Sequence, residues 1–303
     1  MEEIRGELDV PISIVGVCSL APRGILRTSY LTNNCRPRSN KMSTRYCLIV
    51  LILVSSMQLG TATAMAQSIQ TPNNFFGFEI GSDGELARYP RVLEYLRHLA
   101  ARSERVTYTP RGTTTNGNPY VLVTISSQSN LNRLDRLIEI NHRLADPRDL
   151  TEAEVKSLTR EGVPFYFLYV TIHSNEVGNG QAIIQIAHRL ATEQSPQIRE
   201  ILDNTVLLLV PSQNPDGQIL VVDHWYETRG TNYARLYPDL YHRYTGHDDN
   251  RDWFMFTQKE TRLAIDIHRD YKPQLTHDMH QMGPHGARIF VPPFQEPHDQ
   301  IGR

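Results

Sequence analysis

Cysteine is nearly absent from this 303-residue sequence, and the few cysteines present all lie near its start. They are Cys18, Cys35 and Cys47. The rest of the chain therefore has no thiol that could serve as a nucleophile or a metal ligand, and it needs no disulfide bonds. Any metal held there must be bound by His, Asp or Glu side chains.

The sequence also lacks an excess of either charge. It has 31 basic and 33 acidic side chains, which gives a net charge of -2. Proteins that bind nucleic acid normally present a clearly basic face, so nucleic acid is not an expected partner. With 40% apolar residues, the composition is that of a globular protein with one or two domains.

The apolar run Cys47–Val54 is too short to cross a membrane, since a spanning helix needs about 20 apolar residues. It follows the positively charged Arg45 and precedes Ala64-Met65-Ala66, which has the A-x-A pattern of a cleavage site. We therefore predict a secretory signal peptide over residues 42–66, with no stable membrane anchor after its removal. The protein is expected to be exported, and so secreted or periplasmic.

Residues 1–41 precede that signal and show no sustained hydrophobic period. Three prolines are scattered among single apolar residues there. We interpret this segment as a spurious or disordered extension, with translation beginning at Met42. A genuine N-terminal extension is the alternative. Residues 67–303 would then form the functional domain.

Downstream of Gln67 the pattern alternates between helices and strands. Apolar residues at helical spacing predict a helix over 86–101, and two runs around Asn116-Gly117 predict a β-hairpin. The almost wholly apolar runs 163–172 and 205–211 are typical of buried central strands. This order predicts an α/β fold with a mixed parallel and antiparallel sheet flanked by helices. Further helices are expected over 131–144, 152–158, 181–191 and about 258–268.

Polar residues follow both buried strands. His173 and Glu176 lie where the first strand ends, and Asn214–Gly217 (Asn-Pro-Asp-Gly) follows the second. Ligands of such sheets bind beyond the carboxyl ends of the strands. A catalytic zinc takes three ligands from His, Glu or Asp, so His173 and Glu176 are candidates for two of them. Gly178 and Gly180 are expected to permit a tight backbone after them.

A third ligand is sought in segment 274–283, which alternates like a strand. A period of two places Asp278 and His280 on one face and His277 on the other. We favour His280 as the ligand, with His277 as its main rival. Asp278 is expected to orient the side chains around it.

Together these motifs resemble the zinc carboxypeptidases, the carboxypeptidase A type of metallopeptidase. The similarity begins near Gly77 and rests on four motifs in the family's order. These are His-Ser-Asn-Glu (173–176), Asn-Pro-Asp-Gly (214–217), Asp-Asn-Arg-Asp-Trp (249–253) and Asp-Met-His (278–280). The resemblance implies a zinc carboxypeptidase-like fold, one zinc ion per chain, and hydrolysis of C-terminal amino acids from peptides.

The resemblance also implies a role for each matching residue. Asn250 and Arg251 would bind the free C-terminal carboxylate of a peptide substrate, with Arg251 forming two charge-assisted hydrogen bonds. Arg229 follows the Asn-Pro-Asp-Gly motif at a family-like spacing and would stabilise the oxyanion that develops on the scissile carbonyl. The zinc ligands would be His173, Glu176 and His280.

Several neighbouring residues are expected to be structural. Asn214–Gly217 is interpreted as a turn in which Asp216 has an architectural role. Trp253 and Phe254 are expected to belong to the core rather than to a substrate platform.

The sequence departs from the family pattern at two points. Asn175 stands where digestive members carry an Arg, so substrate contacts there are expected to differ. The family's general base is a Glu well downstream of the last zinc ligand, whereas this chain ends at Arg303, soon after His280. We do not assign Glu296, which sits too early and in a Pro-flanked loop. The base is expected beyond residue 303, in a domain that is incomplete at its C-terminus.

Two alternatives to the peptidase stay open. One is a zinc amidoacylase of related fold, which would remove acyl groups from small N-acyl amino acids. The other is a non-catalytic module that holds zinc and a peptide C-terminus but cuts nothing, because its general base is missing.

Export makes a prediction about the mature N-terminus. Cleavage after Ala66 places it at Gln67 or within a few residues of it. N-terminal sequencing of protein recovered outside the cytoplasm checks this expectation. Exported protein that still begins at Met1 would contradict it.

Overall fold

A computed structural model describes residues 68–234 and 249–281. The predicted signal peptide, the segment before it and Glu296 lie outside this part of the chain. All described residues belong to a single unit, Met65–Arg303. None of the helices among them has the length and apolar character needed to cross a bilayer.

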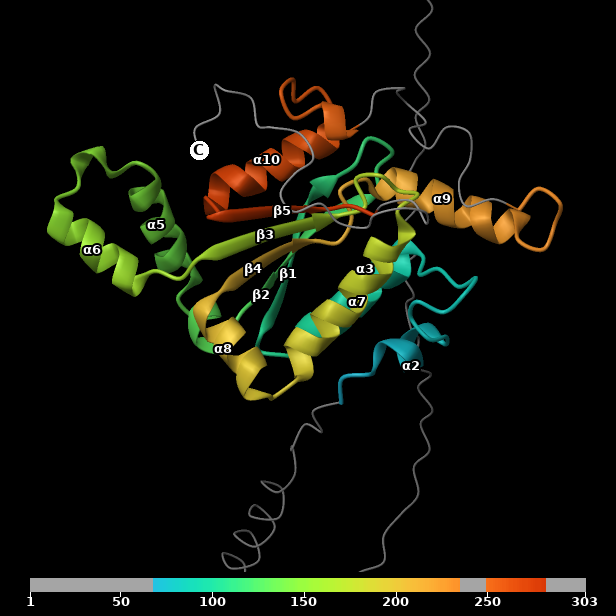
Figure 1. Cartoon of the computed structure of the whole chain (residues 1–303), viewed down its shortest axis with the longest axis horizontal. Coiled ribbons are helices and arrows are strands. Elements are labelled where there is room, and N and C mark those ends of the chain that lie inside the picture. Colours follow the sequence, from blue (N-terminus) through green and yellow to red (C-terminus); the bar gives the residue numbers. More distant parts are fainter. Residues whose placement is uncertain (1–67, 235–248, 282–303) are drawn as a thin grey trace, which may run out of the picture. The chain divides into compact units, whose positions relative to one another are not determined.

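Strands and helices follow the order that the sequence predicts (Figure 1). The structure adds helices that the sequence analysis did not predict, the longest of which has 14 residues, Pro215–Thr228. The strands are β1 (Val106–Thr113), β2 (Pro119–Ile125), β3 (Phe165–Val170), β4 (Val206–Val210) and β5 (Leu275–Met279). The helices are α2 (Pro72–Phe76), α3 (Tyr89–Ala100), α4 (Gln128–Leu131), α5 (Leu134–Ala145), α6 (Glu152–Glu161), α7 (Val177–Thr192), α8 (Pro196–Asn204), α9 (Pro215–Thr228) and α10 (Lys259–Tyr271), with 3-10 turns η1 (Pro147–Asp149) and η2 (Asp249–Arg251).

The described strands form one mixed sheet in the order β1-β2-β4-β3-β5 (Figure 1). β1 and β2 make the predicted antiparallel hairpin, and Gly117 in its turn has φ 87°. β2 also pairs antiparallel with β4, whereas β4, β3 and β5 run parallel. The predicted mixed α/β sheet is confirmed. Because parallel strands end at the same edge, the carboxyl ends of β3, β4 and β5 meet there.

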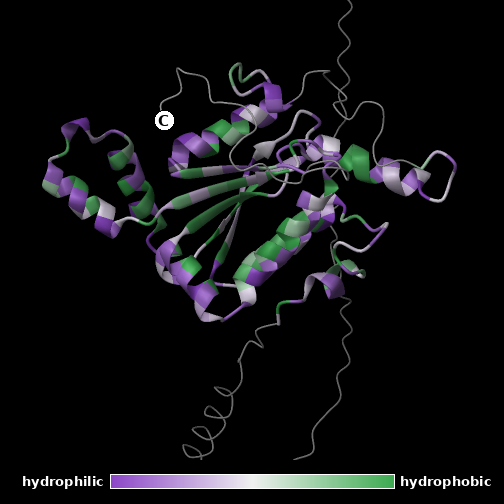
Figure 2. Ribbon diagram, in the orientation of Figure 1, coloured by the Kyte–Doolittle hydropathy of each residue, from purple (hydrophilic) through white to green (hydrophobic). Residues whose placement is uncertain are grey.

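Helices cover both faces of the sheet, as the apolar runs predict. Leu168 and Leu209 pack on the face beneath α3, α7 and α8, whereas Phe167 and Leu208 pack on the opposite face with α5 and α10. Successive strand residues point to opposite faces, so one short apolar strand serves two cores. Figure 2 shows α7 and the middle of the sheet as largely hydrophobic.

The start of α7 differs from the prediction. The helix begins at Val177 rather than at Gln181, so Gly178 and Gly180 lie in its first turns, and neither has a positive φ. These glycines therefore do not supply a tight left-handed turn. They permit close approach instead: a Cβ at Gly180 would lie 3.2 Å from Nε2 of Gln218.

The abrupt change of direction after β3 occurs at Thr171, which has φ 56°. A β-branched residue in the left-handed region is strained and persists only where its surroundings hold it. Oγ1 of Thr171 lies 2.8 Å from Oγ of Ser212, and the N–H of Gln213 donates to the carbonyl of Val170 at 2.7 Å. The ends of β3 and β4 are thereby fastened together just before His173.

The Asn-Pro-Asp-Gly motif begins a helix rather than forming a turn, so that prediction was wrong. Asn214 is the N-cap of α9, and its Oδ1 accepts a hydrogen bond from the N–H of Gly217 at 2.8 Å. Pro215 occupies the first helical position, where its missing N–H costs nothing. Turn and helix-start signals share these residue types, which explains the error.

Asp216 has the predicted structural role. It is only 2% exposed, and its carboxylate accepts hydrogen bonds from Oγ1 of Thr114 (2.5 Å), the N–H of Asn116 (2.9 Å) and Nδ2 of Asn118 (2.7 Å). These donors belong to the β1–β2 hairpin loop. One carboxylate thus fixes the hairpin to the start of α9.

The core prediction for the segment after Arg251 was half right. Trp253 packs against the core on the α5 and α10 face, with its ring 5.5 Å from that of Tyr169. Phe254, by contrast, is 78% exposed. The carboxylate of Asp252 accepts from the N–H groups of Thr257 and Gln258 and closes the loop between them, which turns Phe254 outward.

Replacing Asp216 with Ala should destabilise the fold by about 2–4 kcal/mol, because it leaves several buried donors without their charged acceptor. Urea unfolding of the two forms measures the difference. Asp223→Ala is the matched control on the same helix, since among the described residues Asp223 pairs with the exposed Arg88 alone. Equal losses in the two variants would contradict the structural role of Asp216.

Candidate metal centre

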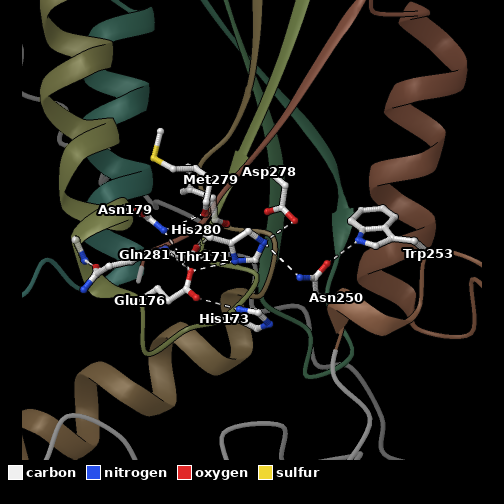
Figure 3. Close-up of polar contacts among 12 residues, drawn as sticks. Thr171, His173, Glu176, Asn179, Asn250, Trp253, Asp278, Met279, His280 and Gln281 are labelled. Carbon is white, nitrogen blue, oxygen red and sulfur yellow. Dashed lines mark hydrogen bonds and ion pairs between the residues drawn. The ribbon is translucent and has the colours of Figure 1, made fainter. Parts of the chain in front are cut away.

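Three side chains with metal-binding atoms converge at the carboxyl ends of β3 and β5 (Figure 3). Nδ1 of His173 lies 3.0 Å from Oε1 of Glu176, and Nδ1 of His280 lies 3.2 Å from Oε2 of the same carboxylate. Within the described residues, these three form a group whose donor atoms all lie within 4.8 Å of one another. All three predicted zinc ligands are therefore brought together.

The rival ligand His277 lies on the other face of β5. Its Nδ1 is 2.6 Å from the hydroxyl of Tyr166, and it lines an apolar cavity with residues of α7 and α8. The alternation of the strand therefore separates His277 from His280, as predicted.

The Glu176 carboxylate accepts hydrogen bonds from several directions. Besides the two histidines, the backbone N–H of Gln281 donates to Oε2 at 2.9 Å, and Nδ2 of Asn179 lies 3.5 Å from it. Burial alone would raise the pKa of Glu176, but the hydrogen bonds from His173, His280 and Gln281 outweigh it and lower the pKa to about 2. Glu176 is thus ionised throughout the neutral range, as a metal ligand must be.

His280 lies between two carboxylates. Its Nε2 is 2.8 Å from Oδ2 of Asp278 and its Nδ1 faces Glu176. The hydrogen bonds to Asp278 and then Glu176 raise the pKa of His280 to about 10 against the opposing effect of burial. Since Nε2–H donates to Asp278, Nδ1 is the nitrogen directed at the centre of the group. The predicted orienting role of Asp278 agrees with this contact.

The donor set fits zinc. Zn–N and Zn–O bonds of about 2.0–2.2 Å in a tetrahedron separate neighbouring donor atoms by roughly 3.3–3.6 Å. The two contacts of Glu176, at 3.0 and 3.2 Å, are within a few tenths of an ångström of that spacing. Two imidazoles and a carboxylate also make up a common catalytic zinc site, so the group needs little rearrangement to hold the ion.

Asn250 and Arg251 occupy η2, beside the metal-binding group. Nδ2 of Asn250 lies 3.3 Å from Nε2 of His280, and Nε1 of Trp253 donates to Oδ1 of Asn250 at 3.3 Å. The tryptophan bond fixes which end of the Asn250 amide faces the metal-binding group. Arg251 is exposed, and its Nη1 donates to the carbonyl of Asn250 at 3.0 Å.

Arg229 is held by the loop that precedes α3. Its Nη1 donates to the carbonyl of Gly84 and to Oε1 of Glu85, both at 3.1 Å, and its guanidinium stacks on the ring of Tyr226. Gly84 and Glu85 also line a cavity of about 490 Å³ that extends along α7 from Val177. The role of Arg229 towards a scissile carbonyl stays a prediction.

Sequence reasoning missed Asn179 and Gln281, which contact the Glu176 carboxylate. A helix places residues three apart on one face, so the spacing of Asn179 from Glu176 was a usable signal. For Gln281 the only signal was its position after His280, because its contact depends on how β5 pairs.

The profile described as zinc carboxypeptidase matches residues 92–285, which is more than half of the chain. The chain belongs to the zinc carboxypeptidase family. The matched range of this carboxypeptidase homologue contains all six predicted site residues.

Individual relatives are distant. Carboxypeptidase Z from Mus musculus is 29% identical over 133 residues, which are 43% of this chain and 16% of that protein. Carboxypeptidase A from Helicoverpa armigera is 19% identical, with a TM-score of 0.45 over 77% of this chain and 54% of that one. A metallo-carboxypeptidase from Burkholderia cenocepacia is 16% identical, with a TM-score of 0.43 over 65% and 42% of the two chains. The chain thus spans about half the length of these solved structures or less.

The three donor side chains lead us to predict the zinc stoichiometry and the effect of single substitutions on zinc binding. The purified chain should bind about one zinc, as a three-ligand catalytic site does. Replacing His173, Glu176 or His280 with Ala should abolish tight binding in equilibrium dialysis. His277→Ala is the control, on the same strand but the opposite face. Loss of zinc in that control, with binding intact in His280→Ala, would contradict the assignment.

Zinc affinity should also rise with pH. Because the pKa of His280 is about 10, His280 carries a proton at lower pH that zinc must displace. The apparent zinc affinity should therefore increase about tenfold per pH unit between pH 6 and 8. Competition with a chelator of known affinity measures this slope. In Asp278→Asn the largest cause of the raised pKa is lost while the Glu176 contact remains, so the slope should flatten at a lower pH than in the unaltered chain. A zinc affinity that does not depend on pH in the unaltered chain would contradict the protonation of His280.

Proposed function

We propose that this protein is a zinc-dependent metallocarboxypeptidase that removes C-terminal amino acids from peptides. The observation that carries the proposal is the His173, Glu176 and His280 group, with Asn250 beside it at the carboxyl ends of parallel strands. Family membership supports the same reaction class.

His173, Glu176 and His280 would hold the zinc. When bound, zinc supplies Lewis-acid polarisation of the scissile carbonyl and lowers the pKa of a water molecule. Asp278 keeps the proton of His280 on Nε2 and so leaves Nδ1 for the ion. This arrangement orients the imidazole and raises its basicity, as second hydrogen bonds to metal-binding histidines generally do.

Selection of the chain end is assigned to Asn250 and Arg251. An exposed guanidinium can bind a carboxylate through two parallel N–H groups, while the amide of Asn250 adds a neutral donor near His280. Only a peptide whose last residue has a free carboxylate satisfies both. Arg229 is proposed to stabilise the developing oxyanion. We assign no general base among the described residues.

The site of action is proposed to lie outside the cytoplasm. This rests on the signal-like segment 42–66. The protein would be secreted or periplasmic, and its substrates would be peptides present there.

The test compares peptides that differ only in a free or an amidated C-terminus. The zinc-loaded chain should bind the free form and release its last residue. Binding of the amidated peptide should be weak. Removal of zinc with a chelator should stop any release.

The Arg251→Ala variant should bind the free peptide about 10- to 100-fold more weakly, as expected for loss of a charge-assisted contact. Arg269→Ala is the control, because within the part of the chain that the structure describes Arg269 forms just an exposed ion pair with Asp266 on α10. Equal affinity for both peptides would contradict the proposal. Binding without any release would identify a peptide-binding module, and release of acyl groups from N-acyl amino acids would identify an amidoacylase.

A further inference from the structure

The first turn of α7 is tied to the end of β5 right beside the metal-binding group (Figure 3). Nδ2 of Asn179 donates to the carbonyl of Met279 at 2.9 Å. The backbone N–H of Gly178 donates to Oε1 of Gln281 at 2.8 Å, and the N–H of Gln281 donates to Glu176 at 2.9 Å. We call the hydrogen-bonded set of Gly178, Asn179, Met279 and Gln281 the α7–β5 clasp.

Gly178 leaves room for this contact, since with a Cβ there the end of the Gln281 side chain would have to shift. A Cβ at that position would lie 2.6 Å from Oε1 of Gln281, closer than real Cβ atoms approach such an oxygen. The backbone itself does not require glycine, since Gly178 is helical and has no positive φ. Alanine is the better helix former, so glycine here serves the approach of Gln281.

The clasp joins the two elements that carry the metal-binding residues. Glu176 is the N-cap of α7, immediately before the clasp, and His280 lies between Met279 and Gln281. Glu176 and His280 are 104 positions apart in sequence. The last register pair of β3 and β5 is Val170 with Met279, so beyond that point the strands no longer align the two ligands.

We infer that Gln281 and Asn179 are positioning residues that hold Glu176 and His280 at metal-binding distance, and that Gly178 is small so that Gln281 can reach it. The inference rests on the proposed zinc site. Gly178 and Gln281 are both exposed, so their bond adds little to the stability of the fold. Loss of this hydrogen bond should lower the zinc affinity and leave the unfolding temperature unchanged.

A double-mutant cycle on the full chain tests the clasp. Zinc affinity is measured by chelator competition, and thermal unfolding is measured without zinc. Gln281→Ala and Gly178→Ala should each weaken zinc binding by about fivefold, the value of one neutral hydrogen bond. The double variant should be no weaker than Gln281→Ala alone, because the added methyl group then meets no side chain.

Two further variants extend the cycle. Asn179→Ala should weaken zinc binding about tenfold, because Asn179 is buried and bonds both segments. Gln185→Ala is the matched control: it removes a glutamine on the same helix that bonds Ile80 instead of β5, and zinc affinity should not change.

The outcomes separate this inference from the proposed function. Additive losses in the double variant, or unchanged affinity in both single variants, overturn the clasp alone. The clasp would also be overturned if the zinc-free Gln281→Ala chain unfolded at a temperature low enough to account for its loss of zinc affinity. The residue would then act on the stability of the fold. Failure of the unaltered chain to bind zinc overturns the proposed function together with the clasp.

Discussion

The parallel pairing of β3 with β5 is the constraint on which the metal-binding group depends. Its register sets Tyr169 opposite Asp278 and Val170 opposite Met279, so His280 emerges beside the loop that carries His173 and Glu176. A shift by one residue would turn His280 to the face now occupied by His277. The packing of Met279 against the core that contains Leu168 opposes such a shift, because the shift would turn Met279 to the other face.

Electrostatic interactions then hold the three side chains together at the position that the strand register sets. The donors are held together by hydrogen bonds among themselves: the Glu176 carboxylate accepts from both histidines, and Nε2 of His280 donates to Asp278. The lowered pKa of Glu176 and the raised pKa of His280 express the same attraction from its two sides. His173, Glu176 and His280 would hold a divalent cation in place of these hydrogen bonds, and the negative charge of Glu176 would favour it.

Local patterns in the sequence predicted most of the fold and all three members of this group. The apolar strands and the choice of His280 over His277 follow from the spacing of residues along short segments. The hairpin follows from the Asn116-Gly117 pair, which favours a tight turn. The errors arose where one local signal has two meanings. Asn214–Gly217 suits a turn and a helix start equally, and Gly178 suits a left-handed turn and a close contact. Only the tertiary contact with Gln281 decides the second case.

Contacts between distant segments were beyond sequence reasoning. Two examples are the ion pair of Arg229 with Glu85 and the α7–β5 clasp. Both join residues whose separation in the chain says nothing about their distance in space. Thr171 belongs with them, because its strained backbone is maintained by Ser212 from the segment after β4. No local propensity indicates a threonine at positive φ.

X-ray absorption at the zinc edge, on the full chain loaded with one equivalent of zinc, tests the central claim most directly. We expect nitrogen and oxygen neighbours of zinc at about 2.0–2.2 Å that include two imidazoles, those of His173 and His280. A shell with a single imidazole, or with none, would contradict the claim that the β3–β5 pairing builds the metal site.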